Sequence, residues 1–229
     1  MIPRFEPLHY RLEAQVETPV GVKTGSSVIE VTTDKSLRSF QVRGEAVAVD
    51  IAPGQTLFVL LRSPQTVDWA GQALNFFPAG KRTGSQPSDP AAREAQAKSE
   101  FDAIRADHGA YPVWDEKAGA SADPEVSWPG TPYLVRFRDL ADPKSVEQVD
   151  PDDLGKSFGP GVWLKSLTVQ VTDAPVTTGT EKRLSQDFWR TWGALHKAEI
   201  DKGSINSNSY FATFSAQLTR DDFIKESAQ

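Results

Sequence analysis

The regular alternation of apolar and polar residues limits the fold of this 229-residue chain more than any other feature. In the segment Phe158–Thr172, Leu167, Val169 and Val171 alternate with polar residues, which is the period-two pattern of a strand with one buried face. The segment Tyr10–Val16 shows the same alternation. Because such strands bury one face against another layer, the pattern predicts layered antiparallel sheet.

One irregularity is expected in the first of these strands. Val162 and Leu164 have the opposite parity to Leu167, so in a regular strand one of the two sets would point away from the core. A bulge or sharp twist near Lys165 and Ser166 would keep both sets inward.

Short apolar or alternating runs predict the remaining strands. The segment 26–33 is expected to pair with the strand around Tyr10–Val16 as a hairpin, with the loop 20–25 between them. The continuous apolar run Thr56–Arg62 is typical of a strand that is covered on both faces. Further strands are expected at 40–43, 46–51, 133–138 and 210–219.

Two longer helices are predicted, at about 90–107 and 186–202. Asp89 is a favourable N-cap for the former. In the latter, Phe188 and Trp192 recur at helical spacing and define its apolar face.

Two shorter helical turns are also expected. Asp150 is placed to cap a short helix that starts at Pro151 and ends before Gly159. Thr219 and Asp222 have the spacing of a capping pair for a last short helix.

These elements predict an α+β fold made mainly of antiparallel β-sheet, with a sandwich as one arrangement of the sheets. The polar segment around Gly80–Pro90 is the weak candidate for a domain boundary, and no long biased linker is present. We therefore expect a single β-rich domain over 1–229, with a helical insertion around 88–108.

The composition limits the classes of partner that the protein can have. A net charge of −6 has the wrong sign for neutralising phosphates, so no nucleic-acid partner is expected. There is no cysteine, and no apolar run has the length of a membrane span. The first residues lack a secretion signal, and the compartment is left open: the cell envelope or periplasm if a leader has been removed, and otherwise the cytoplasm. The oligomeric state is left open.

Several stretches resemble those of an uncharacterised proteobacterial protein family, and together they cover about half of the chain. The resemblance implies no activity; members often begin with an apolar leader, so it implies the cell envelope only if Met1 is not the native start. The matching stretches are YRLEAQVETP, GSSVIEV, VRGEAVAVD, VDPDDL, FGPGV and VTTGTEKRL.

The loop that follows the strand Leu167–Val171 is a candidate anion or ligand site. Hydroxyls and backbone N–H groups around a glycine, followed at once by two cations, can hold an anion. The pattern lacks the spacing of a phosphate-binding loop, and a plain connecting loop explains it equally well. The residues concerned are Thr177, Thr178, Gly179, Lys182 and Arg183.

Tryptophan is enriched at binding hot spots, so four of the six tryptophans are candidates for a partner surface, although core packing is the commoner role of this residue. They are Trp114, Trp128, Trp163 and Trp189.

No catalytic residue, metal site or cofactor is predicted. The acidic group Asp139–Asp153 has the oxygen ligands that Ca²⁺ prefers but not the spacing of an EF-hand, and its aspartates fit turns and helix caps. The histidines His9, His108 and His196 are too widely spaced for a local metal pair, and His196 lies near the apolar face of its helix.

Three functions are consistent with these observations. The first is a non-enzymatic binding or structural module that engages a protein or a cell-envelope component. The second is an enzyme of unfamiliar, hydrolase-like type with a polar site near Thr177–Arg183, and the third is an inhibitor or immunity-type protein with an acidic face. An enzyme should bring several histidines, aspartates or Arg183 together in one pocket, whereas a binding module should not.

Overall fold

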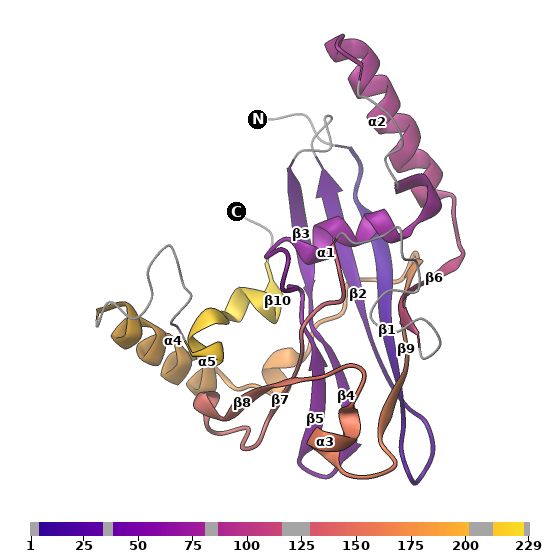
Figure 1. Cartoon of the computed structure of the whole chain (residues 1–229). Coiled ribbons are helices and arrows are strands. Elements are labelled where there is room, and N and C mark those ends of the chain that lie inside the picture. Colours follow the sequence, from indigo (N-terminus) through magenta and orange to yellow (C-terminus); the bar gives the residue numbers. More distant parts are fainter. Residues whose placement is uncertain (1–4, 34–38, 81–86, 116–128, 202–212, 227–229) are drawn as a thin grey trace.

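The structure is a computed structural model that describes residues 5–33, 39–80, 87–115, 129–201 and 213–226. Its core is built from two antiparallel sheets and a layer of helices (Figure 1). The α+β class with mainly antiparallel sheet is thereby confirmed, and the two longer helices lie where the sequence predicts them.

The first sheet has six strands and contains the long β1–β2 hairpin that the sequence predicts. In spatial order its strands are β10 (Ile224–Lys225), β3 (Phe40–Glu45), β2 (Lys23–Thr33), β1 (Leu8–Glu17), β9 (Trp163–Val171) and β6 (Ala110–Asp115).

The second sheet has four strands and faces the first. In spatial order its strands are β4 (Val47–Ala52), β5 (Gln55–Val59), β7 (Leu134–Phe137) and β8 (Val146–Val149).

The predicted irregularity in β9 is present. Gln15 of β1 pairs with Ser166, but the next residue, Val16, pairs with Leu164, so Lys165 has no partner in the register. This bulge turns Leu164 and Leu167 to the same side, where both are buried.

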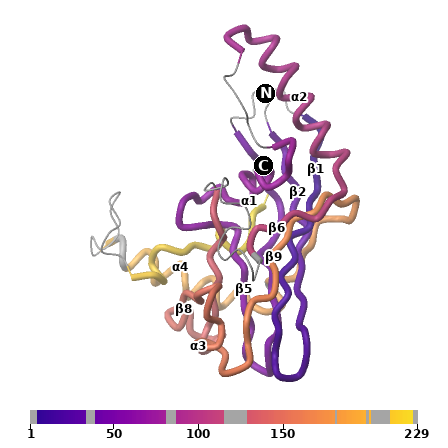
Figure 2. Tube along the Cα trace, turned by 45° about the vertical axis from the view of Figure 1, so that its right-hand side comes forward, coloured from indigo at the N-terminus to yellow at the C-terminus, as the bar shows by residue number. Residues whose placement is uncertain are grey.

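Strand β5 separates two hydrophobic cores, which explains the unbroken apolar run Leu57–Leu61. Leu57 and Val59 pack with residues of the first sheet, whereas Phe58 and Leu60 pack against α4 (Gln186–Asp201) and the C-terminal segment. The layers are therefore the first sheet, the second sheet and α4, in that order, as Figures 1 and 2 show from two directions. A strand covered on both faces must be apolar at every position.

The remaining helices border these layers. α2 (Pro90–Arg105) is capped by Asp89, as the sequence predicts: the Asp89 carboxylate accepts the backbone N–H of Ala92. The helix buries Phe101 and Ile104 in the first core. The other helical segments are α1 (Trp69–Gln72), η1 (Ala73–Phe76), η2 (Pro78–Gly80), η3 (Pro143–Ser145), α3 (Leu154–Phe158), η4 (Thr180–Lys182), α5 (Phe214–Gln217) and η5 (Arg220–Asp222).

The prediction of a strand at 210–219 is wrong. Residues 202–212 lie outside the described part, and Phe214–Gln217 is the short helix α5. Phe214 and Leu218 both pack against the second core. They are four residues apart, a spacing that fits a helix as well as a strand, so the alternation was ambiguous.

Two predicted caps had different outcomes. The short helix α3 begins at Leu154 and is capped by Asp153, whose carboxylate accepts the Lys156 N–H; the predicted cap, Asp150, instead accepts the N–H of Asp152 in the preceding turn. The predicted capping pair of Thr219 and Asp222 is confirmed.

None of the helices in the described ranges combines the length and the apolar character that crossing a lipid bilayer requires.

Candidate functional site

A hollow of about 410 Å³ lies where η3, α4 and α5 meet, on the side of the second sheet that faces away from the first. Such a volume is within the usual range of small-molecule pockets. The described residues that line it are Pro143, Lys144, Val146, Trp192, Leu195, His196, Thr213, Phe214, Ser215 and Ala216.

The inner surface of this hollow is apolar. Val146 of β8, Trp192 of α4 and Ala216 of α5 are all buried. The Trp192 indole N–H donates to the Ser215 carbonyl at 3.3 Å and so ties α4 to α5. An apolar surface that three elements hold in place suits an apolar group of a ligand.

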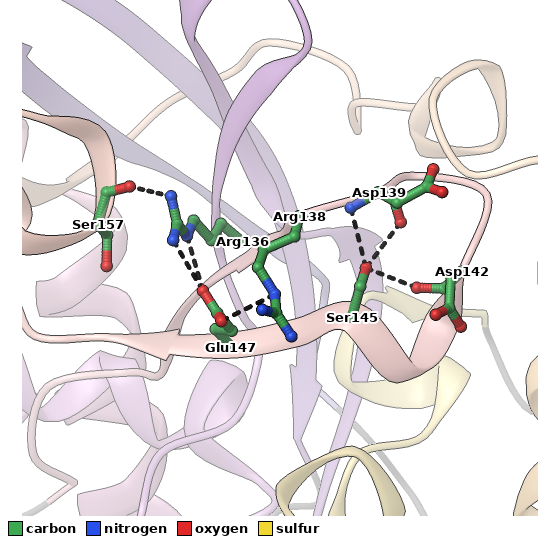
Figure 3. A network of polar contacts seen from close by, with 7 residues as sticks. All are labelled: Arg136, Arg138, Asp139, Asp142, Ser145, Glu147 and Ser157. Atoms are coloured by element: carbon green, nitrogen blue, oxygen red, sulfur yellow. Dashed lines mark hydrogen bonds and ion pairs between the residues drawn. The ribbon is translucent and has the colours of Figure 1, made fainter.

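One side of the hollow is the β7–β8 hairpin, which is held by a charge network (Figure 3). On one face of the hairpin, Glu147 accepts hydrogen bonds from Arg136, and Arg138 pairs with the same carboxylate at 3.0 Å. Arg136 also donates to the Ser157 carbonyl at the end of α3. These contacts fix the hairpin that carries Lys144 and Val146.

The turn of that hairpin is held by one buried hydroxyl, also drawn in Figure 3. Ser145 Oγ accepts the Asp139 N–H at 3.0 Å and lies within donating distance of the carbonyls of Asp139 and Asp142, at 2.8 and 2.7 Å. A single hydroxyl therefore serves three backbone groups of the turn.

We expect Ser145→Ala to destabilise the protein by about 1–3 kcal/mol, because the substitution removes the buried hydroxyl that three backbone groups of this partly buried turn contact. Urea denaturation followed by far-UV circular dichroism measures this change. Ser157→Ala is the control, because only the Ser157 backbone carbonyl takes part in the network and alanine keeps it. Equal losses in both variants would contradict the role of the hydroxyl.

Two polar groups of the hollow have no partner among the described residues. The exposed Lys144 ammonium makes no ion pair with the described residues. The nearby Asp142 carboxylate accepts the Lys144 backbone N–H instead. His196 Nδ1 is buried and makes no hydrogen bond. Lys144 is a cation, and no aspartate or glutamate is among the described lining residues.

The predicted anion site lies elsewhere, on a segment that crosses the outer face of the first sheet after β9. Thr177 exchanges two hydrogen bonds with Val28 of β2: its hydroxyl accepts at 2.9 Å and its backbone N–H donates at 3.1 Å. Thr177 and Thr178 line a second hollow of about 350 Å³ together with Arg43 and Lys225. Glu45 and Glu226 also line it, so its lining is not selectively positive.

The two predicted cations of that site are not part of this second hollow. Arg183 donates to both carboxylate oxygens of Asp50 on β4, at 2.5 and 2.9 Å, and this hydrogen bonding lowers the pKa of the Asp50 carboxyl. Lys182 is exposed and ends η4, which Gly179 precedes with a φ of +148°. The structure thus brings Thr177 and Thr178 together and places the other three residues further along the same loop.

The four candidate tryptophans lie in different surroundings. Trp163 is 44% exposed, at the end of β9, opposite Glu17. Trp114 is buried, and its indole N–H donates to Asp152 at 3.1 Å. Trp189 is partly buried and stacks on Trp192, whereas Trp128 lies outside the described residues. Among the three that are described, Trp163 is therefore the one that offers a large exposed surface.

The acidic group serves the backbone, as the turn and cap signals predict. Asp139, Asp142, Asp150 and Asp153 each accept a backbone N–H within their own turn. Within the described ranges, no three or more histidine, cysteine, aspartate or glutamate residues are grouped as a metal site requires.

The sequence predicts none of the lining residues of the main hollow as site residues. His196 was expected near the apolar face of its helix, and it lies beside Trp192 in the lining. Lys144, Leu195 and the segment 213–216 were not predicted as site residues. The sequence gives no indication that these residues form a site. The segment 213–216 is predicted as part of a strand, and Lys144 follows a proline in what looks like an ordinary turn.

Comparisons of the chain with protein-family models, with curated proteins and with solved structures find no match. The resemblance to a proteobacterial family stays a prediction, and the functional argument rests on the geometry.

Proposed function

We propose that this protein is a non-enzymatic binding module whose recognition site is the hollow between η3, α4 and α5, and that it takes a small ligand with an apolar body. The observation that carries this proposal is the apolar inner surface of Val146, Trp192 and Ala216 beneath a rim of a few polar groups. Apolar enclosure with a few convergent polar groups is the usual composition of a ligand site.

The placement of the acids and bases supports binding rather than catalysis. His9 lies on the first sheet, where its ring nitrogens contact Glu30 and the Ala174 carbonyl. Arg183 pairs with Asp50 at the edge of the second sheet, Asp153 caps α3, and His196 lines the main hollow. Groups that act together in catalysis need to lie within hydrogen-bonding reach of one substrate, and these groups are on separate parts of the fold.

The expectation of a protein or cell-envelope partner stays a prediction, and the exposed Trp163 is the described residue through which to test it. The hydrolase-like enzyme near Thr177–Arg183 and the acidic inhibitor also stay predictions. Of the loop residues that the enzyme hypothesis invokes, Thr177 hydrogen-bonds to Val28 of β2 and Arg183 to Asp50 of β4.

The proposed function is tested with a neutral aromatic probe, naphthylacetamide, titrated into the ¹⁵N-labelled protein. We expect amide resonances of Leu195, Thr213 and Ala216 to shift, with a Kd of about 1 mM or tighter for a fragment of this size. Leu195→Trp should remove these shifts, because the larger side chain occupies the hollow.

Ala194→Trp is the matched control, since Ala194 is the exposed neighbour of Leu195 on α4 and does not line the hollow. It should leave the Kd within a factor of about two of the unmodified protein. Binding that survives Leu195→Trp, or shifts that map to another part of the chain, would place the probe elsewhere and overturn the proposal.

A further inference from the structure

We propose that the ligand of the main hollow is a carboxylate, with its apolar body against Val146 and Trp192 and its carboxyl group beside Lys144. This inference rests on the proposed function and names the chemical class of ligand. The juxtaposition that carries it is an apolar interior beside one cation, with no acid among the described lining residues.

The charge of the lining selects an anion. Lys144 is the only lysine, arginine, aspartate or glutamate among the described lining residues, and its ammonium has no carboxylate partner among the described residues. Glu147, two residues after Ser145, uses its carboxylate on Arg136 and Arg138 instead. An anionic ligand would gain a charge-assisted hydrogen bond from Lys144, and a cationic ligand would meet like charge.

His196 also lines the hollow, but its Nδ1 is buried and closed to a ligand there, so Lys144 is the contact that the carboxyl group uses.

The distribution of burial orients such a ligand. Lys144 is exposed and so lies at the rim, whereas Val146, Trp192 and Ala216 are buried on the inside. A carboxyl group at the rim keeps part of its hydration while the body leaves water, which avoids the large cost of burying a full charge. The aromatic rings of Trp192 and Phe214 in the lining favour a body that is itself aromatic or branched.

The second hollow does not offer this combination. Arg43 already pairs with Glu30 at 3.1 Å, and the acids Glu45 and Glu226 line the hollow together with Arg43 and Lys225. Its charges balance, so an anion gains less there than beside Lys144.

The test compares two probes that differ only in charge, naphthylacetate and naphthylacetamide, at the same ionic strength. We expect the acid to bind about tenfold more tightly than the amide, because a hydrogen bond to a charged group is stronger than a neutral one. Lys144→Met should bring the two affinities to within about a factor of two by weakening only the acid.

Lys156→Met is the control for the loss of one positive charge, because Lys156 is an exposed residue of α3 and does not line the hollow. It should leave the acid-to-amide ratio unchanged. If both probes bind equally in the unmodified protein and in Lys144→Met, the carboxylate assignment is overturned while the proposed function stands. If neither probe binds, the proposed function fails and this inference fails with it.

Discussion

Phe137→Ala is expected to destabilise the protein by about 3–5 kcal/mol, the usual cost of removing a buried phenylalanine ring. Phe137 is 3% exposed, and its ring packs edge to face against those of Phe58, Phe188 and Trp192, at centroid distances of 5.8, 5.2 and 5.8 Å. The loss is a large part of the stability of an ordinary domain. Removing the ring leaves a cavity between the second sheet and α4, so the attachment of α4 should weaken first.

Urea denaturation measures this prediction, with tryptophan fluorescence as the local probe and far-UV circular dichroism as the global one. Val67→Ala is the control, because Val67 is 50% exposed and its truncation should change the free energy of unfolding by less than about 0.5 kcal/mol. A loss below about 1 kcal/mol for Phe137→Ala would show that the second core does not depend on this ring.

Gly25→Ala is expected to cost about 1–3 kcal/mol or more through overpacking. Gly25 lies in β2 and faces β4 of the second sheet. A Cβ atom at this position would collide with the Ala48 carbonyl oxygen and would lie 2.9 Å from Val49 Cγ2. Because the first obstacle is backbone, the collision can be relieved only by moving the sheets apart.

Gly193→Ala in α4 is expected to stabilise the protein, the opposite of the effect of Gly25→Ala. A Cβ atom there meets no other atom within 4 Å, and alanine has the higher helix propensity, so the variant should gain up to about 1 kcal/mol. Both variants are compared by thermal and urea unfolding. If the two variants changed the free energy of unfolding in the same direction, the collision of a Gly25 side chain with β4 would be contradicted.

The candidate site shows how far local pattern extends. The face of α4 that carries Phe188, Trp192 and His196 follows from helical spacing, and the structure places it against the second core and the hollow. The rest of the site comes from η3 and α5. η3 lies far from α4 in sequence, and the segment of α5 is predicted as a strand. The hydroxyl of Thr177 and the guanidinium of Arg183 suggested a ligand site because the sequence does not show which groups they contact. In the fold, Thr177 contacts Val28 of β2 and Arg183 contacts Asp50 of β4.

The sequence by itself determined the antiparallel sheets, the bulge at Lys165, the doubly covered strand β5 and the two long helices, because each depends on the spacing of apolar side chains along a short stretch. Only the tertiary structure decided that α4 packs on the second sheet, that Gly25 must lack a side chain and that Lys144 meets His196 at one hollow. These features depend on distances between segments far apart along the chain, and the period of a local pattern contains no information about them.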